Sequence, residues 1–177
     1  MQYWMQMIIH IFGGNMKEMN GKEFKVKRIE KGIVIDHIRQ GQSMKILKVL
    51  KIDEKHGTPV LVLMFVSSTA FGKKDIIKIE DIALKKKDIS IISLLAPDAT
   101  INVIRNYEVI EKYRVEPPGK IEGVIKCPNS GCITNAKEPV TAKFYVEKKD
   151  GIANEIELRC GYCENIVNGE EITKLLI

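Results

Sequence analysis

The sequence predicts an α+β protein in which a ferredoxin-like βαββαβ domain is followed by a small β-rich domain. Over the first two-thirds of the chain, apolar segments with the spacing of strands alternate with segments that have the spacing of helices. In the last third, short alternating segments surround four cysteines that form two close pairs. The segment Pro117–Gly119 separates the two regions, because two successive prolines remove backbone donors and disfavour helix.

The chain therefore divides into three parts. Residues 1–22 are expected to be an N-terminal extension outside the core, residues 23–116 the ferredoxin-like domain and residues 117–177 the cysteine-containing domain. The extension is apolar, but it lacks the cationic start and the small-residue cleavage site of a signal peptide. Apolar runs such as Pro59–Val66 reach about half of the ~20 residues that a membrane-spanning helix needs. We therefore expect a cytoplasmic protein without a membrane partner.

The elements of the first domain follow from periodicity and from capping and turn residues. Ser43 is placed to cap a helix whose apolar face runs to Leu50, and Asp88 to cap a second helix. Gly32 and the Gly72–Lys74 segment are expected to separate strands. The strands are expected at residues 24–29, 33–38, 59–66, 76–79, 100–105 and 107–115.

The second domain is predicted to be built on a two-stranded ribbon. Apolar and polar residues alternate from Val140 to Glu147 and again from Glu155 to Cys160, and the Asp150-Gly151 pair between them is a hairpin signal. A ribbon of this size buries too little apolar surface to be stable alone. Another source of folding free energy is therefore required.

The four cysteines supply a candidate for that source. The spacings Cys127-x4-Cys132 and Cys160-x2-Cys163 each place two sulfurs on a tight turn, and the hairpin brings the two pairs together. We expect one structural zinc ion, held by all four thiolates with no open position for water or substrate. A thioredoxin-type redox pair, disulfides, and iron in place of zinc are the alternatives. A zinc hydrolase would need an open coordination position, so we do not expect an enzyme.

The positive charge lies in the first domain. Residues 117–177 contain 8 Lys and Arg against 9 Asp and Glu, a net charge of −1, so the overall +5 leaves +6 for residues 1–116. A basic domain can attract nucleic acid, anionic lipid or a small phosphorylated ligand. The rival interpretation is a nucleic-acid-binding zinc-ribbon protein. It is weakened because the ribbon is slightly acidic and lacks clustered arginines and exposed aromatic platforms, and we expect no nucleic-acid partner.

Five segments, taken together with the four-cysteine pattern, resemble the regulatory chain of aspartate carbamoyltransferase. The resemblance runs in order from about Lys25 to about Val167. The segments are Gly32–Ile38, Gly72–Glu80, Ala96–Asn102, Asn106–Val109 and Cys127–Thr134. The resemblance implies a non-catalytic allosteric subunit of pyrimidine biosynthesis that pairs with itself through its first domain. An edge strand near Val34 or Val109 is the candidate dimer contact. It also implies that the zinc domain docks on the catalytic chain.

The resemblance further implies an effector site for CTP and ATP, with UTP acting alongside CTP in some members. By motif match, Asp36 and Lys78 would hold the ribose region, and His37 and Lys112 the phosphates. The remaining residues that would line the pocket are Val26, Ile29, Ile76, Asn102, Ile104, Tyr107 and Val109. The residues alone give a weak signal, because the chain has neither a P-loop nor a Gly-x-Gly-x-x-Gly motif. Without the resemblance, Asp36-His37 would be interpreted as a polar strand end and the lysines as solvated surface.

Overall fold

The computed structural model describes residues 28–53, 55–148 and 156–176, and the chain forms two compact units. Within the described residues, the first unit comprises residues 28–43, 58–83 and 100–113. The second comprises residues 44–53, 55–57, 84–99, 114–148 and 156–176. Each unit is therefore assembled from stretches that are separated in the sequence.

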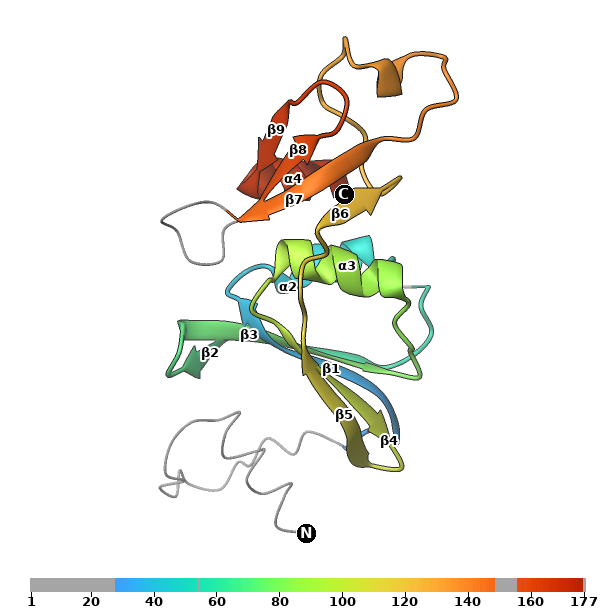
Figure 1. The fold of residues 1–177 in the computed structure, drawn as a ribbon. Coiled ribbons are helices and arrows are strands. Elements are labelled where there is room, and N and C mark those ends of the chain that lie inside the picture. Colours follow the sequence, from blue (N-terminus) through green and yellow to red (C-terminus); the bar gives the residue numbers. More distant parts are fainter. Residues whose placement is uncertain (1–27, 54, 149–155, 177) are drawn as a thin grey trace. The chain divides into compact units, whose positions relative to one another are not determined.

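The first unit contains the five-stranded sheet drawn in blue to olive in Figure 1. Its strands are β1 (Lys31–Arg39), β2 (Val60–Ser68), β3 (Gly72–Glu80), β4 (Thr100–Arg105) and β5 (Glu108–Arg114). They lie in the order β2-β3-β1-β4-β5, and β1 pairs antiparallel with both β3 and β4. The helices α2 (Ser43–Val49) and α3 (Lys86–Leu95) follow β1 and β3 in the chain. The order β1-α2-β2-β3-α3-β4, with β1 between β3 and β4, confirms the predicted ferredoxin-like arrangement.

Several predicted boundaries differ from the structure. Strand β1 runs through Gly32 rather than breaking there: Gly32 has a φ of 149°, and a Cβ at this position would lie 2.1 Å from the backbone oxygen of Ile79. Glycine therefore serves a close approach between strands, and not a turn. Of the strand expected at 24–29, residues 24–27 lie outside the described part, and Arg28 and Ile29 belong to no strand.

Two turn and cap predictions are also corrected. The segment Gly72–Lys74 is the start of β3, because the turn lies at residues 69–71. Helix α3 begins at Lys86, and the Asp88 carboxylate accepts a 2.8 Å hydrogen bond from the backbone N–H of Lys85. Asp88 thus caps the helix from within its first turn.

Both faces of the five-stranded sheet carry apolar side chains, but the apolar cluster on one face is smaller than that on the other. On one face, Ile33, Ile35, Ile77 and Ile79 are almost completely buried. On the other face, a smaller cluster joins Ile29, Val34, Ile76 and Ile104, with Leu63 and Val109 packed against it. Strand β1 is paired on both sides, so Val34 cannot form a sheet edge; β2 and β5 are the outer strands.

The second unit contains a four-stranded sheet where the sequence predicted a two-stranded ribbon. Its strands are β6 (Lys120–Glu122), β7 (Lys143–Lys148), β8 (Ile156–Cys160) and β9 (Ile166–Asn168), in that order. A 3-10 turn, η1 (Ile133–Asn135), precedes β7, and helix α4 (Gly169–Leu176) follows β9. The predicted Asp150-Gly151 turn lies outside the described residues.

The core of this second unit is small. Phe144, Leu158, Val167 and Ile172 are buried together with Cys127, Cys132 and Cys160, and Leu94 of α3 belongs to the same cluster. Helix α3 also contacts α4. Neither β6 nor β9 was predicted, because a strand of three residues is too short to show a periodicity. Helix α4 was also not predicted, although Ile172, Leu175 and Leu176 have the i, i+3, i+4 spacing of a helix. Among the described helices, none has the length and apolar character required to cross a membrane.

Candidate metal centre and effector face

The four cysteines converge at one point of the second unit. Cys127 and Cys132 lie in the loop between β6 and β7, Cys160 ends β8, and Cys163 lies in the turn that follows. Their Sγ atoms all lie within 4.8 Å of one another, with 3.6 Å between Cys127 and Cys163 and 3.8 Å between Cys132 and Cys160. Four sulfurs bound tetrahedrally at about 2.3 Å from zinc are about 3.8 Å apart. The arrangement thus fits a tetrahedral metal ion.

The same distances argue against the alternatives. A disulfide requires an S–S distance of about 2.05 Å, and all four cysteines are free thiols. The Cys160–Cys163 pair follows a strand in a β-sheet domain, whereas a thioredoxin-type pair opens a helix. Cys127, Cys132 and Cys160 are buried, so the site is closed to substrate. These sulfurs can stabilise a fold, but they offer no open coordination position for catalysis.

Two polar residues support the cysteines, and neither was predicted from the sequence. The Thr134 hydroxyl donates a 3.2 Å hydrogen bond to Sγ of Cys132. This bond, together with a hydrogen bond from the Thr134 backbone, lowers the pKa of the Cys132 thiol to about 7. The Asn135 amide donates to the backbone oxygens of Cys127 and Asn129, both at 2.8 Å. Burial raises the pKa of the Cys127 thiol. The only sequence signal was the position of both residues directly after a ligand turn.

The predicted effector residues of the central strands share one face of the first unit's sheet. Val34 of β1 pairs with Lys78 of β3 on one side and with Asn102 of β4 on the other. Because strand side chains alternate, Asp36, Ile76 and Ile104 lie on the same face as these residues. We call this surface the effector face; its described members are Ile29, Asp36, Ile76, Lys78, Asn102, Ile104 and Val109.

The effector face combines an apolar floor with polar groups. Ile29, Ile76, Ile104 and Val109 belong to the small apolar cluster, and the Asn102 amide donates to the backbone oxygen of Val34 at 3.3 Å. Partial burial lowers the pKa of the Lys78 ammonium. A desolvated cation above an apolar floor gains more from an anionic ligand than a solvated surface lysine would.

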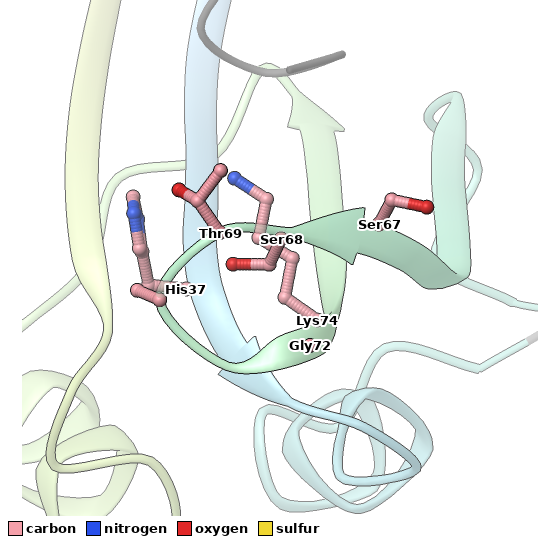
Figure 2. Close-up of a pocket in the computed structure, with 7 residues that line it drawn as sticks. His37, Ser67, Ser68, Thr69, Gly72 and Lys74 are labelled. Atoms are coloured by element: carbon pink, nitrogen blue, oxygen red, sulfur yellow. The ribbon is translucent and has the colours of Figure 1, made fainter. Parts of the chain in front are cut away.

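At one end of the effector face, Asp36 and His37 lie beside Lys74, which was not among the residues predicted from the sequence. The Lys74 ammonium lies 2.9 Å from Oδ1 of Asp36, and both side chains are buried. The backbone N–H of His37 donates to the same Oδ1 at 2.6 Å, and the His37 ring packs edge-on against Phe71. An open cavity of about 320 Å³ lies beside them, shown in Figure 2. It is lined by His37, Ser67, Ser68, Thr69, Ala70, Gly72 and Lys74.

Three predicted residues are not placed among these. Tyr107 lies in the β4–β5 turn, where its N–H donates to the Glu30 oxygen at 3.1 Å and its hydroxyl contacts the Glu30 carboxylate at 3.4 Å. Lys112 is exposed on the outer strand β5. Val26 lies outside the described residues. The structure thus brings seven predicted effector residues to one face.

Comparisons with known proteins point to the same protein family along most of the chain. Residues 24–116 match the allosteric domain of the aspartate carbamoyltransferase regulatory chain, and residues 119–173 match its metal-binding domain. The regulatory chain of Methanocella arvoryzae is 46% identical over 159 residues, which cover 89% of this chain and 100% of the relative. That of Methanocaldococcus jannaschii is 48% identical over 147 residues, which cover 83% and 94%. That of Pyrococcus horikoshii is 46% identical over 151 residues, which cover 85% and 96%.

Proposed function

The chain belongs to the aspartate carbamoyltransferase regulatory chain family, and on that premise we propose that its effector face binds CTP and ATP. UTP is proposed as a further effector. Its two matched domains are an allosteric and a metal-binding domain, so the chain is a regulatory rather than a catalytic subunit. The observation that carries the nucleotide proposal is the partly buried Lys78, which pairs with Val34 on the same sheet face on which Asn102 pairs with Val34 from the other side.

Each part of a nucleotide has a chemical partner among these residues. Lys112 and His37 would hold the phosphates, and Lys78 and Asp36 the ribose region, where the Asp36 carboxylate can accept hydrogen bonds from ribose hydroxyls. The apolar cluster offers a surface for a base, and His37 lies at the cavity beside Lys74. Tyr107 and Val26 are proposed to complete the wall of the pocket. CTP and ATP can act in opposite directions only if they favour different quaternary states.

For the second domain, we propose that a single zinc ion is the metal. The sulfur distances fit zinc, and four thiolates also suit iron, so metal analysis of the purified chain is the deciding measurement. Zinc would supply folding free energy to a domain with a small core, and the folded domain would dock on the catalytic chain. The chain would pair with a second copy through its first domain, for which β2 and β5 are the available sheet edges.

The nucleotide proposal is tested by calorimetric titration of the full chain with CTP and ATP. Lys112→Ala is expected to weaken CTP binding by on the order of tenfold, because a charge-assisted phosphate contact is lost. Lys87→Ala is the matched control, since Lys87 is also exposed but lies on α3. Equal CTP affinity in the two variants would rule out the phosphate role of Lys112.

The docking proposal is tested by removing the metal. A thiol reagent should release zinc, and the treated chain should no longer co-elute with a catalytic chain. The matched control is the same chain reconstituted with zinc, which should co-elute again. If the metal-free chain still assembles, the zinc domain does not provide the docking surface.

A further inference from the structure

Strand β3 carries two adjacent charged residues, Lys74 and Asp75, at the level where both neighbouring strands are irregular. In β1, Asp36 and His37 occupy a position that corresponds to one residue of β3, since Ile35 pairs with Ile77 and Ile38 with Asp75. In β2, Met64 and Phe65 form the same irregularity, since Leu63 pairs with Ile76 and Val66 with Lys74. Each neighbour therefore contains a one-residue bulge, which lies opposite Ile76 in β1 and opposite Asp75 in β2.

Both bulges hold a bulky residue in a left-handed backbone conformation. The φ angle is 61° at His37 and 58° at Phe65. Residues other than glycine adopt this conformation at an energetic cost, because Cβ comes too close to the backbone carbonyl oxygen. Such a conformation persists only where surrounding interactions hold it, so the groups that hold these two bulges determine where His37 and Phe65 lie.

The Asp75 carboxylate holds the β2 bulge and the chain that leaves β1. Its side chain is completely buried. Oδ1 accepts from the Phe65 N–H at 3.0 Å, and Oδ2 accepts from the Gly41 N–H at 2.8 Å, the Ser43 hydroxyl at 2.9 Å and the Ser43 N–H at 3.3 Å. One carboxylate therefore joins β2, β3 and the segment between β1 and α2.

Lys74 holds the β1 bulge from the opposite face of β3. Its buried ammonium pairs with Asp36 at 2.9 Å, and the same Asp36 oxygen accepts the His37 N–H. Because successive side chains of a strand point to opposite faces, the two residues secure one bulge each without competing for space. A shift of β3 at this level would move both bulges.

We propose that Asp75 is a positioning residue for the effector site. By fixing β2 and the Gly41–Ser43 segment against β3, it sets the position of Lys74 and, through Lys74, of Asp36 and His37. Asp75 does not itself touch the nucleotide, since its side chain lies on the face of Ile77 and Ile79. The inference rests on the proposed nucleotide function where it predicts a change in CTP affinity. It rests only on the backbone arrangement where it predicts a change in amide hydrogen exchange.

The test compares Asp75→Asn, which keeps the side-chain volume but replaces one acceptor by a donor, with Ser43→Ala, which removes one of the four hydrogen bonds. The full zinc-loaded chain is titrated with CTP, and amide hydrogen exchange is measured by NMR. Both variants are expected to accelerate exchange at Phe65 and His37, with Asp75→Asn reaching about tenfold, and to weaken CTP binding in the same order. Exchange at Val103 should be unchanged, because Val103 lies on β4, which pairs with β1 and not with β3.

Asp53→Asn is the matched control. Asp53 also accepts a backbone hydrogen bond, from Lys55 at 2.9 Å, but its side chain is exposed, so no effect is expected. Unchanged exchange at His37 in Asp75→Asn, or an equal acceleration at all amides, would overturn the positioning role. If Asp75→Asn does not fold, Ser43→Ala decides by the same criteria. If the unmodified chain does not bind CTP, the proposed function fails, and the exchange pattern alone still decides the role of Asp75.

Discussion

The guanidinium of Arg114 donates a 2.7 Å hydrogen bond to the Asp98 carboxylate and so joins the end of β5 to the turn before β4. The Asp98 side chain is 2% exposed, whereas that of Arg114 is 61% exposed. The next residue, Val115, donates its N–H to the Ala99 oxygen at 3.0 Å. Arg114 and Val115 are therefore both bonded to the Asp98–Ala99 turn, immediately before the Pro117–Gly119 segment.

Arg114→Met should lower the free energy of unfolding by about 1–2 kcal/mol, because the buried Asp98 carboxylate loses its cationic partner. Denaturant unfolding of the full chain measures this effect. Lys120→Met is the control, since it removes a 2.9 Å ion pair with Glu122 in which both side chains are about half exposed. That variant should leave the stability almost unchanged, because an exposed ion pair is screened by solvent. Equal effects of the two substitutions would contradict the prediction.

Gly32→Ala should destabilise the first unit by at least about 3 kcal/mol, because the added Cβ would collide with the Ile79 oxygen and Gly32 has a positive φ. Thermal unfolding followed by circular dichroism would measure the loss. The matched control is Gly119→Ala, where an added Cβ meets nothing within 4 Å. A Gly32→Ala chain as stable as the control would show that the strands can separate at this point without cost.

Thr134→Val should weaken metal binding by roughly tenfold, because the hydroxyl that donates to Cys132 would be replaced by a methyl group. Competition with a coloured zinc chelator provides the measurement. Thr134→Ser keeps the hydroxyl and should retain the original affinity. If valine and serine give the same affinity, the hydrogen bond to Cys132 does not contribute to metal binding.

As the pH rises, CTP affinity should begin to fall at a lower pH than it would if the ligand were held by a solvent-exposed lysine. Burial lowers the pKa of Lys78, so its ammonium loses its charge in the folded chain before that of a solvated lysine as the pH rises. CTP affinity measured calorimetrically over an alkaline pH series should show this decline, and Lys78→Met should bind more weakly and lack it. A decline that persists in Lys78→Met would assign the titration to another group.

The order of elements and the metal ligands could be predicted from the sequence because both depend on local signals. Alternation at the strand and helix periods predicted the βαββαβ order, and tight turns between closely spaced cysteines predicted the four sulfurs. Local signals failed where a strand had only three residues, as in β6 and β9, and where a residue served a contact between strands, as Gly32 does. The helical spacing of α4 was present in the sequence but was not recognised. The roles of Asp36 and His37 were assigned by family resemblance, since their types and spacing alone gave little signal.

The sequence by itself determined which residues could bind a metal and which segments could form the sheet. Only the tertiary structure decided that Lys74 pairs with Asp36 and that Asp75 accepts hydrogen bonds from Gly41, Ser43 and Phe65. The reason is that these contacts depend on the register between strands, and two one-residue bulges set that register. A bulge is stabilised by partners that are distant in the sequence, so a periodic pattern along the chain does not predict it.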